Sequence, residues 1–207
     1  MIAVIDYGVG NLGSVLKAFQ FLNVPVILTS DHDKILKAQG VVLPGVGAFG
    51  AGMKNLKKSG LNNTINEIIK LNRPFLGICL GLQLLFSSSE ENPGIKGLDI
   101  IKGKVTKFKL GKVDKIPHMG WNQVEIQKKD PLFVSFSRKR NFYFVHSYYV
   151  KPENQDIILG TTSYCQQEFA SVIRDSNIWA IQCHPEKSSK VGLEVLNKFS
   201  EVAINGT

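Results

Sequence analysis

The first 86 residues alternate between two hydrophobic periods. Short continuous apolar runs with β-branched residues are typical of strands buried on both faces, and helical spacing follows each run. Leu12, Val15 and Phe19, for example, share one helical face, and Asn11 is the predicted N-cap of that helix. The pattern predicts strands at residues 2–7, 25–30, 40–45 and 73–78, and helices at residues 11–22, 31–38, 61–71 and 80–86.

Beyond residue 100 the pattern changes to strand-like segments separated by Gly, Pro and Asn, and an amphipathic helix closes the chain. Buried strands separated by helices indicate an α/β fold, a doubly wound, mostly parallel sheet with helices on both faces. The second half is expected to add antiparallel strands to this sheet. No linker-like tract divides the chain, so residues 1–207 are predicted to form one domain. The later strands are expected at residues 104–109, 122–127, 141–150, 157–164, 169–175 and 178–184, and the helix at 190–203.

Composition is that of an ordinary globular protein. Of 207 residues, 43% are hydrophobic and 20% charged, and no apolar run approaches the ~18 residues of a membrane span. The N-terminus has the pattern of a strand rather than of a signal peptide, so we expect a cytoplasmic protein with no membrane association. Three widely spaced cysteines without a CxxC argue against a disulfide framework and a structural zinc site. The four histidines form no ligand cluster, and no metal or other cofactor is expected.

The net charge of +8 changes this picture little. Basic residues are scattered, with local clusters at residues 54–59 and 137–140. A nucleic-acid binder would more often carry a basic stripe with interleaved aromatic residues. We therefore expect a solvated basic surface and no nucleic-acid partner, with docking onto an acidic partner as an alternative.

A glycine motif at residues 8–13, GVGNLG, leaves one alternative function open. It follows a predicted strand, opens a helix, and is followed by Asp31 near the end of the second strand, as in a dinucleotide-binding unit. A lone match is weak, because glycines are often needed where a strand turns tightly into a helix. A dinucleotide-binding protein remains the alternative on this motif.

The strongest candidate chemistry lies in the apolar segment FLGICLGLQLLF, residues 75–86. A free cysteine such as Cys79 is often a buried small hydrophobe, but GICLG also has the form of a nucleophile elbow with cysteine in the place of serine. Flanking glycines let a strand turn abruptly into a helix, which presents the apical side chain at the carboxyl end of the sheet. The N-terminus of that helix favours a thiolate, so Cys79 is the candidate nucleophile.

A cysteine nucleophile needs a histidine oriented by a third group, and the segment IWAIQCHPEKS supplies both. His184 and Glu186 are two residues apart, so in an extended segment they point to the same side and Glu186 can orient the imidazole. His184 can take a proton from Cys79 and later give one to a leaving group. Cys183 is expected to face the core, and Cys165 has no identifiable partner.

The segment PGVGAFG, residues 44–50, supplies a candidate oxyanion hole just after the third predicted strand. Glycines let backbone N–H groups approach a substrate closely. The N–H groups of Val46 and Gly47, with that of Leu80, are expected to hold the negative oxygen of a tetrahedral intermediate. A plain tight turn is the alternative for this segment taken alone.

Together, GICLGLQ, PGVGAFG and HPEKS resemble the class I (triad) glutamine amidotransferases over nearly the whole chain. DYGVGNLGSV, PHMGWN and FYFVHSYY make the likeness greatest to glutaminase subunits that serve a (β/α)8 cyclase subunit of histidine biosynthesis. The resemblance implies that Cys79 attacks the side-chain amide of glutamine, forms a cysteinyl thioester and releases ammonia. It also implies glutamine binding by Gln83, by the backbone of Gly45 and Gly47, and by Ser147 and Tyr148.

The resemblance further implies a heterodimer in which ammonia passes to the cyclase subunit. The implied interface residues are His118, Met119, Gly120, Trp121, Asn122 and Lys187. In related subunits the oxyanion loop closes only when the partner holds its ligand, and the same is expected here. Cys183 stands where an aromatic residue is common, a departure expected to change packing only. Three alternatives remain: a glutaminase subunit that feeds ammonia to a different barrel synthase, one that makes an amidinated surface sugar; a catalytically silent binding subunit; and a cysteine peptidase.

Overall fold

Twelve strands join in one sheet within the described residues, which are 1–10, 12–109, 111, 115–134 and 139–205 of this computed structural model. Five strands at the centre and one edge run parallel. In spatial order they are β2 (Val26–Thr29), β1 (Ile2–Ile5), β3 (Gly40–Leu43), β4 (Phe75–Ile78) and β12 (Ile178–Ile181). The parallel part comes almost entirely from the first half of the chain, as predicted.

The second half adds antiparallel strands beside β12. The sheet continues through β11 (Gln167–Asp175), β10 (Ile158–Tyr164), β7 (His118–Ile126) and β8 (Lys139–His146). A branch is formed by β5 (Phe86–Ser89), β6 (Ile101–Lys107) and β9 (Tyr148–Pro152), and β9 joins it to β11. The predicted extension of the parallel sheet by antiparallel strands is therefore confirmed.

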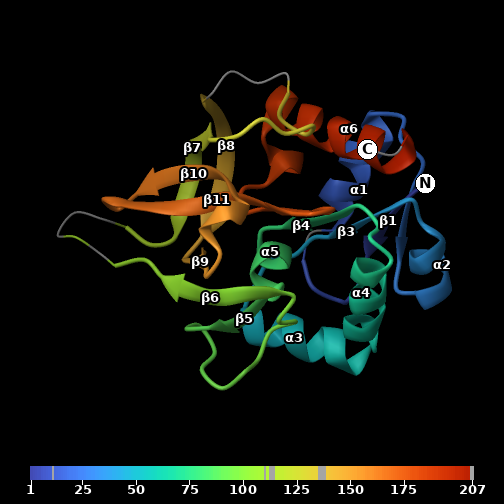
Figure 1. Ribbon diagram of the computed structural model, residues 1–207, viewed down its shortest axis with the longest axis horizontal. Helices are drawn as coiled ribbons and strands as arrows, with labels where there is room; N and C mark the ends of the chain where they lie inside the picture. The colour runs from blue at the N-terminus through green and yellow to red at the C-terminus, as the bar shows by residue number, and fades with distance from the viewer. Residues whose placement is uncertain (11, 110, 112–114, 135–138, 206–207) are drawn as a thin grey trace.

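Helices cover both faces of the parallel strands (Figure 1). The first face carries α1 (Leu12–Phe21) and α6 (Ser189–Asn205), and the second carries α2 (His32–Lys37), α3 (Phe49–Lys58), α4 (Leu61–Lys70) and α5 (Leu80–Leu84). Alternation along β1 explains this, since Ile2 and Val4 pack with the first set and Ala3 and Ile5 with the second. The doubly wound fold class predicted from the sequence is confirmed.

Three local expectations differ from the structure, and a fourth falls on a residue that it does not describe. Helix α3 was not expected, because its glycines and lysines hide the helical period; its first N–H groups are capped from far away, by Glu91 Oε2 and Asn92 Oδ1, each at 2.7 Å. The predicted helix at residues 80–86 ends at Leu84, and Phe86 begins β5. The single strand expected at residues 141–150 is two strands with a break at Ser147. Asn11, the predicted N-cap of α1, lies outside the described residues.

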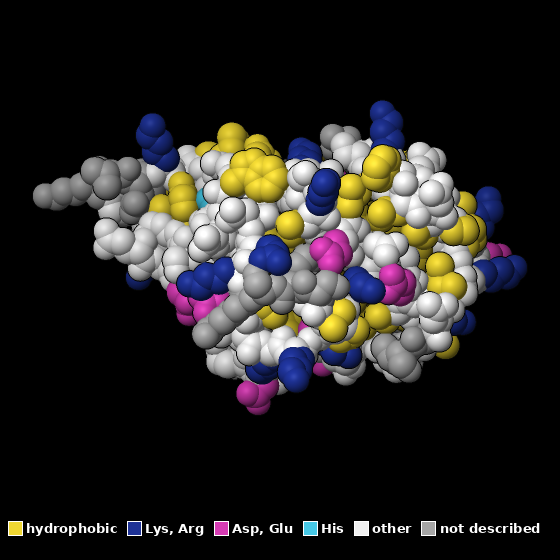
Figure 2. Space-filling view, turned by 90° about the horizontal axis from the view of Figure 1, so that it is seen from above, with side chains coloured by type: hydrophobic (Ala, Val, Ile, Leu, Met, Phe, Trp, Pro, Cys, Tyr) yellow, Lys and Arg dark blue, Asp and Glu magenta, His cyan; other side chains and the backbone are white. Residues whose placement is uncertain are grey.

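The face shown in Figure 2 carries Lys and Arg side chains that are scattered among uncharged ones rather than gathered in a stripe. This distribution agrees with the solvated basic surface expected from the sequence. Within the described residues, no helix has both the length and the apolar character needed to cross a membrane.

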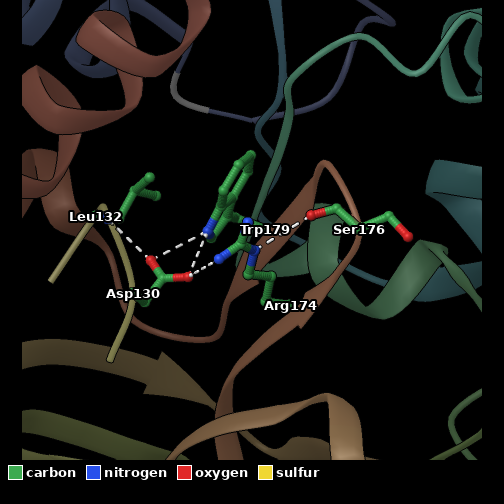
Figure 3. A network of polar contacts seen from close by, with 5 residues as sticks. All are labelled: Asp130, Leu132, Arg174, Ser176 and Trp179. Carbon is green, nitrogen blue, oxygen red and sulfur yellow. Dashed lines mark hydrogen bonds and ion pairs between the residues drawn. The ribbon is translucent and has the colours of Figure 1, made fainter. Parts of the chain in front are cut away.

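A buried carboxylate ties the segment after β7 to the sheet (Figure 3). Asp130, whose side chain is fully buried, accepts hydrogen bonds from Trp179 Nε1 at 3.2 Å and from the N–H of Leu132 at 2.8 Å. Arg174 forms an ion pair with it at 2.9 Å and stacks over the Trp179 ring, 4.8 Å from its centroid. A buried charge is tolerated only with partners of this kind.

Asp130→Ala is expected to lower the free energy of unfolding by about 3 kcal/mol, because Trp179 Nε1 and the Arg174 guanidinium lose their shared acceptor. Denaturant unfolding followed by circular dichroism measures the change. Lys198→Ala is the control: its partly exposed surface pair with Glu201 is expected to contribute no more than about 0.5 kcal/mol. Equal losses in the two variants would contradict the account.

Candidate active site

The structure places Cys79 at the turn between β4 and α5, with φ +53° and ψ −105°. This is a conformation that a non-glycine residue adopts rarely. The turn is held from both sides, since the N–H of Cys79 donates to Ile181 O at 2.8 Å and its carbonyl accepts from Gln83 N at 3.3 Å. A Cβ on Gly81 would overlap the Leu43 carbonyl, so the glycine after the cysteine is required for the close approach of α5 to β3.

His184 and Glu186 follow β12, and their side chains meet. His184 Nδ1 lies 2.7 Å from Glu186 Oε1, and the two side chains are only 2% and 4% exposed. The backbone of His184 is fixed by its N–H bond to Tyr143 O at 2.9 Å. Because Nδ1 is engaged by the carboxylate, Nε2 is the nitrogen left for chemistry. It is buried and makes no hydrogen bond within the described part of the chain, although Cys79 is close enough to shift the pKa of the ring.

Opposing effects act on the pKa of His184. Burial alone would lower this pKa, but interactions with Cys79 and then with the Glu186 carboxylate outweigh it and raise the pKa of His184 to about 10. An imidazolium beside the sulfur can hold a thiolate electrostatically and can later protonate a leaving group. Cys183 differs: it is 1% exposed, and burial raises the pKa of its thiol, so it packs in the core as expected.

The raised pKa of His184 predicts a pH dependence with a definite sign. The unfolded imidazole has a pKa of about 6.5, so the stabilisation from charged His184 is complete below about pH 6.5 and is lost as the pH rises through about 10. NMR titration of the imidazole should show this pKa in the free chain. Glu186→Gln should lower it, whereas Glu201→Gln on the exposed end of α6 should leave it unchanged. If His184 titrated near pH 6.5 in the unaltered chain and in Glu186→Gln alike, the proposed interaction of its imidazole with Glu186 would be contradicted.

The candidate oxyanion donors are not assembled in this structure. The N–H of Leu80 donates to Gly45 O at 3.2 Å, so a carbonyl occupies the position where a substrate oxyanion would have to bind. Val46 is half-buried, and Gly47 is exposed with φ +110°. The Pro44 carbonyl is held separately by the Tyr7 hydroxyl at 2.8 Å. The loop therefore has one peptide, Gly45–Val46, whose carbonyl must turn away before Leu80 can donate to a substrate.

A cavity of about 240 Å³ opens beside Cys79 and contains most of the residues expected to bind glutamine. It is formed between the end of β4, the residue 46–47 turn and the break between β8 and β9. Gly45 is buried and does not line it. The lining residues are Val46, Gly47, Cys79, Leu80, Gln83, Glu91, Pro117, Val145, His146, Ser147 and Tyr148.

The amide of Gln83 is oriented by its neighbours. Its Nε2 donates to Tyr148 O at 3.1 Å and to Gln182 Oε1 at 3.2 Å, and both contacts use the amide hydrogens. Since Gln83 lines the cavity, its Oε1 is the atom left to accept a hydrogen bond there. Gln182 in turn places its Nε2 3.7 Å from the Cys79 sulfur, so the two glutamines connect the nucleophile with the cavity wall.

Sequence reasoning missed several residues at this site, among them His146, Glu91 and Gln182. Glu91 lies in a segment where the sequence pattern predicts neither a helix nor a strand, and no local signal links it to Cys79. Gln182 could have been found, because it stands two residues before His184 in an extended segment and so shares its side. Among the described residues, no group of three His, Cys, Asp or Glu side chains is arranged to hold a metal ion.

The residues expected at a partner interface differ in exposure, and all except Lys187 lie on β7. Met119 and Trp121 are 61% and 57% exposed, Gly120 and Asn122 are half-buried, and Lys187 is exposed near the adjoining edge of β8. The expectation that His118 also faces a partner is wrong. Strand alternation turns it inward, where it is 2% exposed and stacks between Phe144 and Tyr164, with ring centroids 4.7 and 4.0 Å away.

The glycine motif at residues 8–13 has a structural role in the fold, which differs from the dinucleotide binding considered as an alternative. Gly8 and Gly10 have φ values of +74° and +102°, and a Cβ on Gly10 would lie 3.0 Å from Val46 N. The turn therefore packs against the residue 44–47 loop beside the cavity. Asp31 accepts from Lys34 N at 3.1 Å and caps α2, which gives this carboxylate a structural role in place of ribose binding.

A cysteine at a strained turn, a buried His–carboxylate pair and a cavity at the carboxyl edge of a parallel sheet suit a thiol-dependent amide hydrolase. Comparison with known proteins agrees. The model of the family described as glutamine amidotransferase class-I matches residues 3–202, and this chain belongs to that family. It is a glutamine amidotransferase, as the resemblance in the sequence implied.

Individual proteins within this family are similar to the chain over nearly its whole length. The chain is 50% identical to "Imidazole glycerol phosphate synthase subunit HisH" of Moorella thermoacetica over 97% of this chain and 94% of that protein. It is also 50% identical to the protein of the same name from Methanocaldococcus jannaschii, over 98% of this chain and 100% of that one. A solved structure of a glutamine amidotransferase from Thermotoga maritima shares the fold, with a TM-score of 0.67 at 19% identity, covering 97% of this chain and 82% of that one.

Proposed function

We propose that this chain is the glutaminase subunit of an imidazole glycerol phosphate synthase. The observation that carries the proposal is the Cys79, His184 and Glu186 site on a chain that is 50% identical over nearly its whole length to two subunits of that name. The whole chain would act as one amidotransferase domain in the cytoplasm. Its product, ammonia, would pass to a (β/α)8 cyclase subunit that makes imidazole glycerol phosphate and an aminoimidazole carboxamide ribotide in histidine biosynthesis.

In the proposed reaction, Cys79 is the nucleophile, His184 transfers protons, and Glu186 orients His184. The Cys79 sulfur attacks the side-chain carbonyl carbon of glutamine and forms a tetrahedral oxyanion. His184 gives its proton to the departing nitrogen, the C–N bond breaks, and ammonia leaves a glutamyl thioester on Cys79. His184 then takes a proton from water, whose oxygen attacks the thioester carbon. Collapse releases glutamate and the thiolate, while Glu186 holds the imidazole in one orientation throughout.

Glutamine specificity would come from acceptors in the cavity wall. Gln83 presents Oε1, and the Glu91 carboxylate lines the same cavity, with its Oε2 already bonded to Phe49 N. Two acceptors, one of them charged, suit the α-ammonium group of the amino acid. Ser147 and Tyr148 line the same cavity, where Ser147 separates β8 from β9 and Tyr148 begins β9.

The oxyanion loop would act as the switch. Rotation of the Gly45–Val46 peptide would remove the Gly45 carbonyl from the Leu80 N–H and direct the Val46 N–H toward the same position. Two donors would then face the developing oxyanion. The hydrogen bond that holds the resting state is a single neutral one, so a modest preference of the partner complex for the rotated state would shift the equilibrium.

The partner surface is proposed on the exposed face of β7, with Met119 and Trp121 as apolar anchors and Lys187 beside them. Tryptophan and methionine are enriched where interfaces are most apolar, and tryptophan is common among energetic hot spots. Trp121 packs edge-on against Tyr143, with ring centroids 6.2 Å apart, so part of this surface is already ordered in the free chain.

Release of ammonia and glutamate from glutamine tests the proposal. The chain alone should be weakly active, because Leu80 is occupied. Addition of a histidine-pathway cyclase subunit with its phosphoribosyl ligand should stimulate it strongly, and Cys79→Ala should abolish both activities. Strong activity that ignores this cyclase would assign another ammonia acceptor. A folded chain with no activity under any condition would reject the proposed function.

Gly45→Ala should lower the partner-stimulated kcat by about 10²-fold and also lower the melting temperature, because the added Cβ would overlap the buried Tyr7 hydroxyl and lie 3.0 Å from Leu80 Cβ, which displaces the loop that has to rotate. The double variant Tyr7→Phe/Gly45→Ala removes the overlapping hydroxyl and should regain part of the stimulation. Steady-state kinetics of the complex measures both. Full stimulation in Gly45→Ala would count against the switch.

A further inference from the structure

Two buried histidines next to the cavity take no part in the proposed chemistry. His146 lines the cavity and is 6% exposed, and His118 lies beneath it on β7, 2% exposed. Their rings are joined, with His118 Nδ1 at 2.8 Å from His146 Nε2. His146 also contacts Tyr148 O, and His118 also contacts the Asn122 side chain. The pair therefore connects a partner-facing strand with the glutamine pocket.

The direction of these hydrogen bonds follows from the backbone groups at the pocket end. His146 Nδ1 lies 2.8 Å from Tyr148 O, and a carbonyl can only accept, so Nδ1 carries a hydrogen. In a neutral imidazole the other nitrogen is then bare, and His146 Nε2 must accept. The hydrogen between the two rings consequently belongs to His118 Nδ1, which leaves His118 Nε2 as an acceptor.

The contacts of Asn122, at the end opposite Tyr148, independently give the same direction for these hydrogen bonds. Asn122 Oδ1 accepts from Gln123 N at 2.7 Å and Asn122 Nδ2 donates to Ser163 O at 3.0 Å, so two backbone groups determine which way the amide points. Its second amide hydrogen faces His118 Nε2 at 3.1 Å, which is the acceptor that the pocket end requires. All donors and acceptors match from Asn122 through His118 and His146 to the Tyr148 carbonyl.

Both rings must be neutral for this arrangement, and their surroundings make them so. Aromatic rings surround them, including Phe108 and Phe169 at 5.4 and 5.3 Å from His146, and no carboxylate contacts either ring among the contacts of the described residues. Burial lowers the pKa of His118 to about 4. Burial, with the charges of His118 and His184 added, lowers the pKa of His146 to about 3 despite the bond to Tyr148.

We propose that His146 and His118 are positioning residues for glutamine binding, which hold the Tyr148 carbonyl and through it the amide of Gln83. The same carbonyl accepts from His146 Nδ1 at 2.8 Å and from Gln83 Nε2 at 3.1 Å. As long as the carbonyl stays in place, Gln83 keeps Nε2 toward the protein and Oε1 toward the cavity. This inference rests on the proposed glutamine pocket.

The expected effect is on binding rather than on the chemical step. Loss of the His118 donor leaves His146 Nε2 buried without its partner, so the bond from Nδ1 to Tyr148 O has to hold the ring without that support, and the ring can turn away from the carbonyl. The pocket then loses the orientation of its Gln83 acceptor. Cys79, His184 and Glu186 are untouched, so KM for glutamine should rise while kcat stays nearly constant.

Imidazole nitrogen NMR tests the hydrogen-bond directions without any assay of activity. At pH 7, both His118 and His146 should be neutral with the hydrogen on Nδ1, the tautomer required by the bonds above. A hydrogen on Nε2 of either ring, or a charged ring, would overturn the inference. This readout does not depend on whether the chain hydrolyses glutamine.

Glutamine binding tests the consequence in a chain that cannot react. Calorimetric titration of the Cys79→Ala chain with L-glutamine gives the reference Kd. Adding His118→Phe, which keeps an aromatic ring between Phe144 and Tyr164 but has no donor, should weaken binding about tenfold. The control Phe144→Leu disturbs the same stack without removing a hydrogen bond, and should lower the melting temperature while leaving the Kd unchanged.

The outcomes separate the inference from the proposed function. Equal Kd values for the reference and for His118→Phe would overturn the positioning role, even if the reference binds glutamine well. If His118→Phe does not fold, Asn122→Leu provides a second test. It removes the Asn122 amide that donates to His118 Nε2, at the far end of this series of hydrogen bonds, and should weaken glutamine binding about threefold. A reference chain that binds no glutamine would reject the proposed pocket itself and with it this role, whatever the tautomers show.

Discussion

Cys79 keeps a backbone conformation that an L-residue adopts only under constraint, at a cost on the order of 1–3 kcal/mol. The constraint comes from two directions. The parallel strand β12 accepts its N–H through Ile181, and the first turn of α5 donates to its carbonyl through Gln83. These two bonds, with the close approach allowed by Gly81, offset the strain and place the sulfur at the carboxyl edge of the sheet.

The same contacts organise the rest of the site. Ile181 ends β12, so the strand that holds the elbow also delivers Gln182 and His184 to the sulfur. Gln83, which closes the first turn after Cys79, also forms the wall of the cavity and bonds to Tyr148. Cys79, His184 and Gln83, the proposed nucleophile, base and substrate acceptor, are thus linked through a few backbone bonds rather than placed independently. In the proposed oxyanion loop, the hydrogen bond from Leu80 N–H to Gly45 O has to break before the proposed competent state can form.

Much of this arrangement could be predicted from the sequence because the decisive signals are local. Apolar runs and helical spacing placed β1 to β4 and α1 to within a few residues, the glycines around Cys79 indicated the turn, and the spacing of His184 and Glu186 indicated their contact. Features set by distant contacts could not be predicted. Helix α3 is capped by Glu91 and Asn92 from another loop, and Glu91 reaches the cavity only through that fold. His118 was misplaced because its strand was expected to begin only at residue 122, so the alternation that buries it was not visible.

Labelling with a glutamine-analogue electrophile, followed by peptide mass mapping, tests the central claim most directly. The chain has three cysteines: Cys79 and Cys183 are buried, and Cys165 is partly exposed. Simple accessibility would favour Cys165, whereas the account predicts that the adduct forms on Cys79 alone and that free glutamine suppresses it. An adduct on Cys165 in preference to Cys79, or labelling of Cys79 that glutamine does not suppress, would contradict the account.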